Sequence, residues 1–321
     1  MMIGSDVSYA AQLLEKGEVV AIPTETVYGL AGNAFDKMAV AKIFEIKNRP
    51  AFNPLIVHIK NFDYIHQIAK NIDERLLRLF KRFSPGPLTI LVEKKNVIPD
   101  IVTAGSPRVA VRIPNHPLTL KLLSLLDFPL AAPSANPFQY ISPTSALQVA
   151  EQLGNKIPYI LDGGKSTIGI ESTIVGIEDN RVVVYRLGGL ELEEIEKITG
   201  KVEVKTNYKS DENVQTPGQF KKHYAPKKPL LIGKLEELVS RYPDKKIAIL
   251  TFGNALSYFR NADVCVYNLS ETADLREAAA RFFEVLYQID QSDADLIIAE
   301  LLPDEGLGRA INDKLKRASV E

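Results

Sequence analysis

Hydrophobic positions along the chain follow two spacings, one typical of helices and one typical of buried strands. Residues 37–47 carry apolar side chains on one helical face, and Asp36 stands where a capping residue belongs. Residues 19–22 form a short, continuously apolar run, which favours a buried strand. Ser142 and Pro143 form a helix-start signal, a serine cap followed by a proline in the first turn. The same patterns predict helices at 7–14, 73–83, 117–126 and 142–153, and strands at 55–59, 88–92, 109–113, 129–132, 159–161, 172–177 and 182–185.

The pattern becomes more regular in the last third of the chain, where strands and helices alternate. Strands are predicted at 230–232, 247–251, 264–267 and 296–299, and helices at 235–241, 255–259, 274–289 and 311–318. Such alternation predicts a parallel sheet with helices on both faces. The polar segment before it contains two prolines and a glycine, which is typical of a linker. We therefore expect an α/β protein with one domain at 1–204, a linker at 205–228 and a second domain at 229–321.

The composition is that of a globular protein with balanced charge. The 321 residues include 39 Lys+Arg and 40 Asp+Glu, which gives a net charge of −1. Broad electrostatic capture of nucleic acid needs a basic surface, so this balance argues against it, although a local basic cleft is compatible with it. The single cysteine, Cys265, excludes an intrachain disulfide and fits a cytoplasmic protein. Because Cys265 lies in a predicted strand, we interpret it as a core residue.

No segment predicts a membrane span, a secretory signal or a zinc site. The apolar stretches are far shorter than the ~20 residues that cross a bilayer. Residues 1–9 lack a basic segment followed by an apolar run. The histidines, His58, His66, His116 and His223, do not have the spacing of zinc ligands. We therefore predict no membrane attachment and no metal site made of protein ligands.

Polar segments rich in proline and glycine interrupt the first domain, nearly all of them at predicted strand ends. Ligands of open α/β sheets bind at strand ends, and loops of this composition offer hydroxyls, amides and backbone N–H groups to an anion. Each segment alone is explained as a turn. As a set, they place basic side chains beside serine, threonine and asparagine, which is the lining expected for a nucleoside triphosphate. These basic residues are Lys47, Arg49, Arg108, Arg112 and Arg186.

Several common catalytic signatures are absent from the sequence. It contains neither the Gly-x-x-x-x-Gly-Lys-Ser/Thr of a P-loop nor a Gly-x-Gly-x-x-Gly after a predicted strand. No arrangement of serine or cysteine with histidine that would make a nucleophile can be identified. A basic cavity that is rich in hydroxyls and lacks a nucleophile suits catalysis by positioning and charge neutralisation.

Taken in order, the motifs of the first domain resemble those of the YrdC-type family. They are PTETVYGL at 23–30, KNRP at 47–50, NPLIVH at 53–58, SPGPLT at 84–89, TAG at 103–105, VAVR at 109–112, APSAN at 132–136, DGG at 162–164 and GIESTIV at 169–175. PGQFKKHYAPKKPL at 217–230 and GLGRAINDKLKRAS at 306–319 look like the long two-domain form. The resemblance implies a YrdC-like twisted sheet domain with a concave cleft, a linker, and a smaller Rossmann-like parallel α/β domain.

The activity that this resemblance implies is an adenylating synthesis in two stages. The amine of L-threonine captures bicarbonate, and the resulting carboxylate attacks the α-phosphate of ATP, giving threonylcarbamoyl-AMP and pyrophosphate. A separate transferring enzyme then passes the threonylcarbamoyl group to an adenosine beside the tRNA anticodon, so contact with tRNA would be indirect. Mg²⁺ would neutralise the phosphates with few direct protein ligands.

The resemblance also implies roles for individual residues. Thr26, His58, Arg112, Ala132 and Ser172 would surround threonine and bicarbonate. Lys47, Arg49, Asn53, Arg108, Ser134, Asn136, Ser142, Arg186, His223 and Tyr224 would surround ATP. Lys47 and Arg49 are the expected catalytic groups at the phosphates, and Arg112 is the expected partner of the threonine carboxylate. At Arg108 the backbone is expected to matter more than the side chain.

His223 and Tyr224 belong to the linker, which we expect to close over the nucleotide as a lid. The linker departs from the family pattern at two positions, with Gln219 in place of methionine and Phe220 in place of tyrosine. Phe220 keeps the ring but lacks the hydroxyl, so any hydrogen bond from this position to ATP would be lost.

Two other functions fit parts of the sequence. A double-stranded RNA-binding or ribosome-assembly factor could use the same fold, but the hydroxyl-rich turns at strand ends favour a pocket for a small molecule. The carbamoyltransferase that matures hydrogenases uses a related domain. That protein carries cysteine-rich zinc modules, which a chain with one cysteine cannot form.

Overall fold

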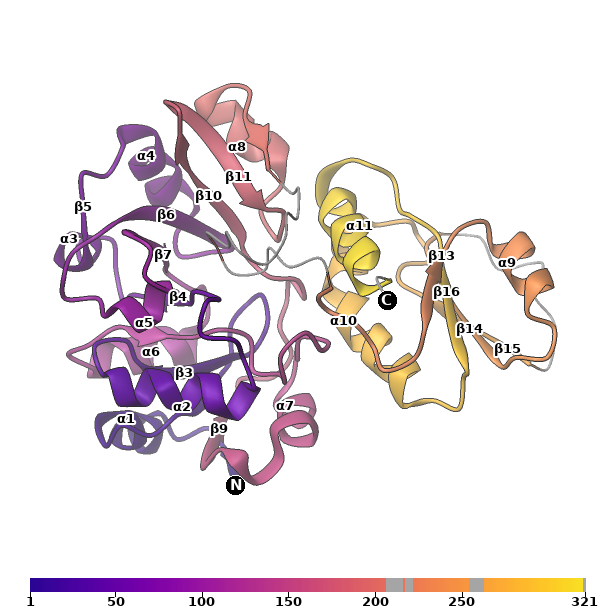
Figure 1. Ribbon diagram of the computed structural model, residues 1–321, viewed down its shortest axis with the longest axis horizontal. Helices are drawn as coiled ribbons and strands as arrows, with labels where there is room; N and C mark the ends of the chain where they lie inside the picture. Colours follow the sequence, from indigo (N-terminus) through magenta and orange to yellow (C-terminus); the bar gives the residue numbers. More distant parts are fainter. Residues whose placement is uncertain (206–215, 217–221, 254–262, 320–321) are drawn as a thin grey trace.

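The computed structural model describes residues 1–205, 216, 222–253 and 263–319, which form two α/β units (Figure 1). The sheet of the first unit ends at Val204, and the sheet of the second begins at Leu230. The two largest clusters of buried apolar residues lie against these two sheets. Within the described residues, no helix is long and apolar enough to cross a membrane.

The first unit is built on one mixed, twisted sheet with the strand order β1-β9-β2-β3-β8-β4-β7-β6-β10-β11-β12, and β5 pairs with β6 beside this path. β2 and β3 form an antiparallel pair, whereas β4 runs parallel to β7. The strands are β1 Met2–Gly4, β2 Val20–Ile22, β3 Gly29–Asn33, β4 Ile56–His58, β5 Ala69–Lys70, β6 Leu88–Lys94, β7 Arg108–Arg112, β8 Leu130–Ala131, β9 Tyr159–Leu161, β10 Thr173–Glu178, β11 Arg181–Arg186 and β12 Glu203–Val204.

Helices cover this sheet, and their apolar faces form its core. α1 and α6 pack together over β2 and β9, while α2 and α4 contribute to a separate, larger cluster. As predicted, Asp36 caps α2, and its carboxylate accepts a hydrogen bond from the amide of Met38. The helices are α1 Val7–Glu15, α2 Lys37–Lys47, α3 Ile65–Ile68, α4 Glu74–Phe83, α5 Asp100–Thr103, α6 Pro117–Leu125, α7 Ala146–Leu153, the 3₁₀ turn η1 Gly154–Lys156, and α8 Leu192–Thr199.

The second unit is a parallel sheet with helices on both faces, as the alternating pattern predicts. Its strands are ordered β13-β16-β14-β15, and each neighbouring pair is parallel. α9 packs on one face, while α10 and α11 pack on the other. The helix predicted at 255–259 lies outside the described residues. The elements are β13 Leu230–Ile232, α9 Leu235–Arg241, β14 Ile247–Thr251, β15 Val264–Asn268, α10 Leu275–Gln291, β16 Leu296–Ala299 and α11 Gly306–Ala318.

Three details of the sequence interpretation are wrong. α7 begins at Ala146 rather than at Ser142, because Ser145 is the cap and accepts the amide of Gln148. α11 begins at Gly306, five residues and more than a full turn before the predicted start at residue 311. Cys265 is exposed rather than buried in the core, because β15 is an edge strand of the second sheet.

The two units share apolar surface and touch through backbone. One hydrophobic cluster contains Val27 and Ile170 of the first unit together with Phe282 and Phe283 of α10. Gly169 has a positive φ of 76°, and a side chain there would collide with the carbonyl oxygens of two residues on α10. Figure 1 shows α10 and α11 on the side of the second unit that faces the first. The loop before β10 is therefore pressed directly against the second unit.

Polar contacts also join the units. The hydroxyl of Tyr287 donates to Glu151 over 2.8 Å, and Tyr140 donates to Asp290. Asp290 in turn accepts the backbone amide of Lys227, where the chain enters the second unit, over 2.7 Å. These contacts hold α10 against the first unit from several directions.

Candidate functional site

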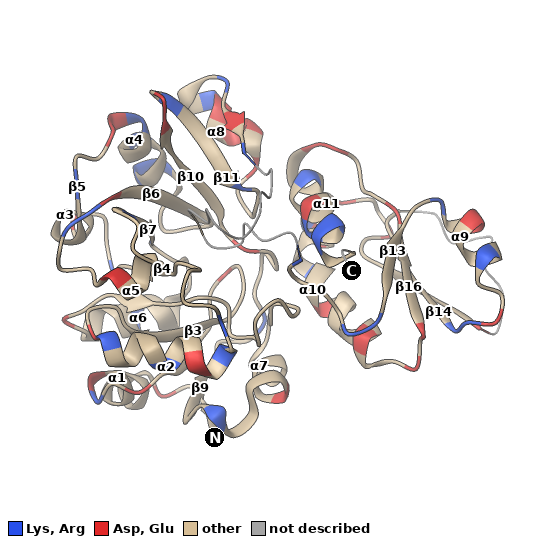
Figure 2. Cartoon of the chain, viewed as in Figure 1, with Lys and Arg blue, Asp and Glu red and all other residues tan. Residues whose placement is uncertain are grey.

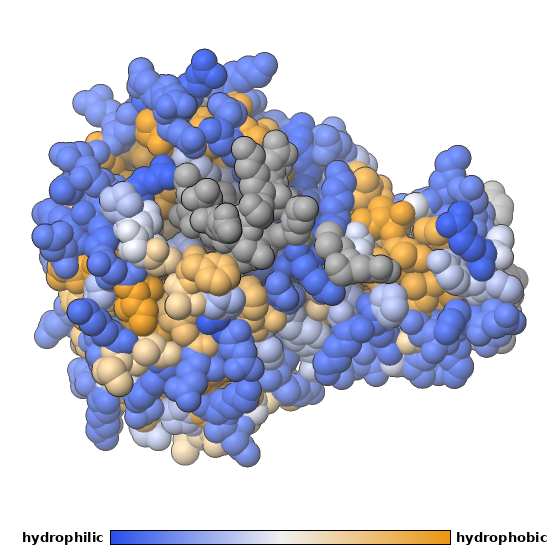
Figure 3. Space-filling model, viewed as in Figure 1, coloured by the Kyte–Doolittle hydropathy of each residue, from blue (hydrophilic) through white to orange (hydrophobic). Residues whose placement is uncertain are grey.

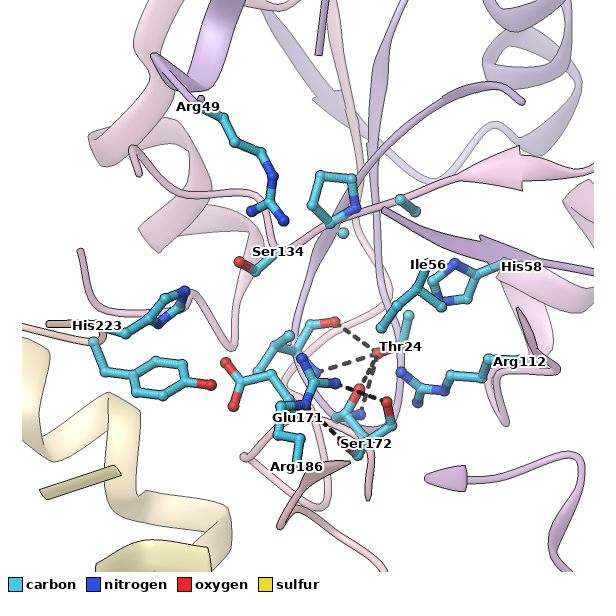
Figure 4. Close-up of a pocket in the computed structure, with 16 residues that line it drawn as sticks. Thr24, Arg49, Ile56, His58, Arg112, Ser134, Glu171, Ser172, Arg186 and His223 are labelled. Atoms are coloured by element: carbon cyan, nitrogen blue, oxygen red, sulfur yellow. Dashed lines mark hydrogen bonds between the residues drawn. The ribbon is translucent and has the colours of Figure 1, made fainter. Parts of the chain in front are cut away.

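A cavity lies where strand ends of the first sheet meet the segment that leads into the second unit (Figure 4). The space between its walls is about 560 Å³, part of which is open to solvent. The loops after β2 and β8, strand β4, the ends of β7 and β11, and the residues before β10 all contribute. The lining residues are Thr24, Thr26, Val27, Gly29, Arg49, Ile56, His58, Arg112, Ala132, Pro133, Ser134, Glu171, Ser172, Arg186, His223 and Tyr224.

All five residues predicted to surround threonine line this cavity, and the loop after β2 orients one of them by hydrogen bonds. The hydroxyl of Thr24 donates to the carbonyl of Val27 over 2.6 Å. The oxygens of Thr24 and Thr26 lie 2.8 Å apart, so the Thr26 hydroxyl is the donor between them. The oxygen of Thr26 is left as an acceptor on the cavity wall.

His58 is a neutral imidazole with open hydrogen-bonding capacity. It is 3% exposed, and neither ring nitrogen has a hydrogen-bond partner in the part of the chain that the structure describes. Burial and the adjacent Arg112 lower the pKa of His58 to about 3. The parallel register of β4 and β7 pairs His58 with Arg112, which explains why the two side chains are neighbours. A neutral imidazole offers one donor and one acceptor, which suits a ligand hydroxyl or carboxylate.

Arg112 forms a buried ion pair that the sequence did not reveal. Its guanidinium lies 2.7 Å from the carboxylate of Glu25, and its Nε donates to the carbonyl of Gly86 over 3.2 Å. Glu25 also accepts the backbone amide of Asn115 over 3.0 Å. Glu25 stands between two threonines in the loop after β2. Its position inside a motif at a strand end was the feature of the sequence that could have identified it as a site residue.

Arg186 is hydrogen-bonded to Ser172, as the dashed lines in Figure 4 show. Arg186 donates from Nε to the carbonyl of Ser172 and from Nη2 to its hydroxyl, both over 3.0 Å. The Ser172 hydroxyl also lies 2.7 Å from that of Thr89 on β6. Burial lowers the pKa of Arg186. Arg186 is therefore a fixed cation with its orientation set by the loop before β10.

Five of the residues predicted to surround ATP line the cavity: Arg49, Ser134, Arg186, His223 and Tyr224. Arg49 follows α2 and points toward the cavity in Figure 4. Asn53 orients it, accepting from the guanidinium at its backbone oxygen over 3.2 Å and at its side-chain oxygen over 2.6 Å. Burial and the nearby Arg186 lower the pKa of Arg49. Asn53 itself does not line the cavity and acts through Arg49.

Lys47, Asn136 and Ser142 lie behind the wall rather than on it. The ammonium of Lys47 donates to the carbonyl of Ser134 over 2.6 Å and to the carbonyl of Asn136. Its burial, and then the charge of Arg49, lower the pKa of Lys47. In this arrangement Lys47 shapes the turn that carries Ser134. The direct contact with phosphate predicted for Lys47 stays a prediction.

Arg108 lies apart from this cavity. Its guanidinium is 3.2 Å from the hydroxyl of Tyr185 and 5.6 Å from the centre of that ring, near the other end of β7. The side chain therefore does not belong to the group of cations at the cavity. A role for the backbone at this position remains a prediction.

Glu171 is a lining residue that the sequence interpretation missed. Its carboxylate accepts from the hydroxyl of Ser142 over 2.6 Å and lies 3.4 Å from the ammonium of Lys314 on α11. Burial opposes its ionisation, but the charges of Lys314 and Arg186 and the hydrogen bonds to the carboxylate together outweigh that effect, so the pKa of Glu171 lies below its ordinary value. Ser142 thus reaches the site through Glu171.

His223 and Tyr224 fill the side of the cavity toward the second unit. The backbone amide of His223 donates to the carbonyl of Arg317 over 3.2 Å, and Tyr224 has a positive φ of 63°. Burial and then the charge of Arg317 keep the pKa of His223 well below its ordinary value, so the ring is neutral. The hydroxyl of Tyr224 is buried and has no hydrogen-bond partner among the described residues. Gln219 and Phe220, where the linker departs from the family pattern, lie outside the described residues.

Comparison with known proteins matches both parts of the chain. Residues 12–188 match the family described as "Telomere recombination", and residues 190–320 match "Threonylcarbamoyl-AMP synthase, C-terminal domain". The threonylcarbamoyl-AMP synthase of Pyrococcus abyssi is 42% identical over 97% of this chain and 93% of its own length. That of Bacillus subtilis is 40% identical over 98% of this chain and 92% of its own length.

Solved structures give the same relationship in three dimensions. The crystal structure of P. abyssi Sua5 complexed with L-threonine has a TM-score of 0.92 and 39% identity, covering 99% of this chain and 98% of its own. A structure of the same protein with an adjacent histidine and tyrosine changed to alanine has a TM-score of 0.91. Here an adjacent histidine and tyrosine occur in the sequence at 223–224.

The mixed sheet, its cation-lined cavity and the Rossmann-like second unit define the two-domain form of the YrdC-type enzymes. Both parts of the chain match that form, and full-length relatives share about two-fifths of its residues. The chain belongs to the threonylcarbamoyl-AMP synthase family, whose activity is that of a nucleotidyltransferase.

Proposed function

We propose that this chain makes threonylcarbamoyl-AMP and pyrophosphate from L-threonine, bicarbonate and ATP, for the modification of adenosine beside the tRNA anticodon. The observation that carries the proposal is that one cavity gathers two kinds of lining group. We assign Thr26 and the neutral His58 beside Arg112 to a first half, for the amino acid, and Arg49 and Arg186 to a second half, for the triphosphate. Arg186 lies at the border between them, because it donates to Ser172. The P. abyssi relative that shares this fold has been crystallised with L-threonine.

The first half suits a small zwitterion with a hydroxyl. The guanidinium of Arg112 can engage the threonine carboxylate bidentately. Thr26 and His58 offer acceptors and a donor to the threonine hydroxyl. The amine then faces bicarbonate, and loss of water gives a carbamate whose charge the cations of this wall stabilise.

The second half suits the triphosphate. In the adenylation step a carbamate oxygen bonds to the α-phosphorus, and the bond from that phosphorus to the bridging oxygen of the β-phosphate breaks. The electron pair leaves on pyrophosphate. Arg49 and Arg186 are fixed by hydrogen bonds before any ligand arrives, so they can stabilise this developing charge without reorganising. The buried positive charge that they carry is itself favourable for binding a polyanion.

Mg²⁺ is proposed to enter with ATP. Glu171 is the one acidic residue among the described lining residues, and Ser142 and Lys314 already engage its oxygens. These residues fit an ion held mainly by phosphate oxygens and water, as Mg²⁺ often is. When bound, the ion would neutralise phosphate charge, while the cavity walls orient the reacting groups.

The product is proposed to pass, in the cytoplasm, to a separate enzyme that transfers the threonylcarbamoyl group, so contact with tRNA is indirect. Figure 2 shows acidic and basic residues interspersed over both units in this view, with no face of one sign. Figure 3 shows a mainly hydrophilic face on which apolar residues gather in one area of the first unit and in one area of the second. On the face shown in these views, this mixture of charges does not favour a double-stranded RNA-binding module, which tracks a phosphate backbone.

The test is mass spectrometry of the purified protein incubated with ATP, Mg²⁺, bicarbonate and threonine. We expect threonylcarbamoyl-AMP and pyrophosphate when all four are present, and neither when threonine or bicarbonate is omitted. ATP hydrolysis that is independent of threonine, without threonylcarbamoyl-AMP, would contradict the proposal.

A further inference from the structure

We propose that Lys314, on helix α11 of the second unit, is a positioning residue of the cavity in the first unit. Its role is to hold the Glu171 carboxylate away from Arg186, so that Arg186 stays available to the triphosphate. This inference rests on the proposed function, because it assigns Arg186 to ATP.

Lys314 reaches the back of the cavity wall. Its side chain is fully buried, and its ammonium lies 3.4 Å from one oxygen of Glu171 and 3.1 Å from the carbonyl of Leu187. The other oxygen of Glu171 accepts from Ser142 over 2.6 Å. Glu171 is therefore fixed from two sides, by a residue of the first unit and by a residue of the second. Figure 2 shows basic residues on α11, the helix beside the first unit.

Arg186 is the cation that Glu171 would otherwise attract. Among the described residues, no ion pair within 4.0 Å joins the two side chains, although they are close enough to influence each other's ionisation. Arg186 instead donates to the backbone and hydroxyl of Ser172. An ion pair with Glu171 would cancel part of the positive charge that faces the cavity. Lys314 prevents that cancellation by competing for the same carboxylate.

Stability alone does not account for the ion pair between Lys314 and Glu171. A buried ion pair contributes little to stability compared with well-packed apolar side chains, because both charges are removed from water. The ammonium of Lys314 lies 5.3 Å from the centre of the Tyr224 ring, and the guanidinium of Arg317 lies 4.8 Å from the same centre. The charged and titratable groups that face Glu171 or Lys314 are Arg186, Tyr224, Asp313 and Arg317.

The experiment is a mutant cycle read by the affinity for ATP. Calorimetry with ATP and Mg²⁺ gives the dissociation constant for Lys314→Met, Glu171→Gln, the double variant and Lys314→Arg. Lys316→Met is the matched control, because Lys316 is exposed on the same helix. We expect Lys314→Met to weaken ATP binding about tenfold, Lys314→Arg to restore most of it, and Lys316→Met to leave it unchanged.

The decisive comparison is the effect of Lys314→Met on ATP affinity in the wild-type protein and in the Glu171→Gln variant. If Lys314 acts through Glu171, Lys314→Met costs nothing once Glu171→Gln has removed the negative charge. The defect of Lys314→Met is also expected to shrink as pH falls and Glu171 takes up a proton, which a loss of packing would not do. An equal loss of ATP affinity in both backgrounds, with no dependence on pH, would overturn the proposal.

The experiment remains interpretable if Lys314→Met fails to fold or if the wild-type protein proves inactive. If Lys314→Met does not fold, a double variant that binds ATP more weakly than Glu171→Gln would still overturn the proposal, because Glu171 could not mediate that loss. ATP affinity does not require turnover, so the cycle remains readable if the wild-type protein makes no threonylcarbamoyl-AMP. A wild-type protein that makes no threonylcarbamoyl-AMP would refute the proposed function. An active enzyme in which the effects of Lys314→Met and Glu171→Gln on ATP affinity simply add would refute the role of Lys314 alone.

Discussion

Arg112 and Glu25 form a buried ion pair with a separation of 2.7 Å, and the two side chains are 4% and 5% exposed. The carboxylate that Arg112 is proposed to bind, that of threonine, therefore arrives at a guanidinium that already holds a carboxylate. A guanidinium has five donors, so it can serve both if Glu25 keeps one edge of the fork. Glu25 then orients Arg112 rather than competing with the substrate.

Removing Arg112 is expected to damage both threonine use and stability. A lost charge-assisted hydrogen bond costs about 1.5–3 kcal/mol, so Arg112→Met should raise the KM for threonine roughly tenfold or more. It should also lower the free energy of unfolding by about 3–5 kcal/mol, because Glu25 is left unpaired. Steady-state kinetics and denaturant unfolding measure the two effects.

The control for this prediction is the double variant Glu25→Gln/Arg112→Met. It removes both charges, so stability should recover while threonine use does not. Recovery of both would mean that Arg112 has a structural role and does not contact threonine.

Arg49 and Asn53 should affect ATP together. Arg49→Ala is expected to raise the KM for ATP about tenfold or more, since a charge-assisted contact is worth about 1.5–3 kcal/mol. Asn53→Ala should raise it less, because Asn53 only orients the guanidinium. Arg78→Ala, at an exposed position on α4, is the matched control. If Arg49→Ala weakened threonine use and spared ATP, the division of the cavity into two halves would be wrong.

Selectivity at the amino-acid half should depend on the hydroxyl. Valine replaces that hydroxyl with a methyl group and would leave Thr26 and His58 facing it without partners. Unpaired buried polar groups cost roughly 1–3 kcal/mol each, so valine should be a much poorer substrate than threonine, and serine a poor but detectable one. Competition assays with the three amino acids measure the ratios of kcat/KM. Equal turnover of valine and threonine would show that the hydroxyl is not recognised.

His58 should make the protein sensitive to acid. Its pKa is about 3 in the folded chain against 6.5 in the unfolded chain, so below pH 6.5 the unfolded state takes up a proton that the folded state refuses. Stability is therefore lost as pH falls from 6.5 toward 3, by about 1.4 kcal/mol per pH unit. His58→Asn, compared with wild type at pH 7.5 and pH 4.5 by denaturant unfolding, should lose less stability on acidification by about 2–3 kcal/mol. Parallel losses in the two proteins would show that His58 is not buried as a neutral ring.

Regular elements and single motifs were predictable from the sequence, because the information for them is local. The apolar face of α2 and its cap at Asp36 lie within one short segment, and the structure confirms both. Strand β3 was missed, since Gly29 and Gly32 weaken its apolar pattern and it is defined by pairing with β2. Ser142 was assigned to a helix cap although its hydroxyl is committed to Glu171.

The carboxylates of the site could not be predicted for a different reason. Glu25 and Glu171 are recognisable only by their partners, Arg112 and Lys314, which are distant in sequence. The contact between Glu171 and Lys314 also crosses from one unit to the other, so no pattern within the first domain reports it. Resemblance to a family located the cavity, whereas the positions of the charges behind its wall required the three-dimensional structure.

Gly169 brings the loop before β10 into backbone contact with α10 of the second unit. Because its backbone rests directly on the backbone of α10, no side chain lies between the two that could yield or change rotamer. A displacement of α10 toward the first unit would therefore press on the backbone two residues before Glu171. A molecule that binds α10 and pushes it toward the first unit would thus strain the loop beside Ser172 without touching the cavity.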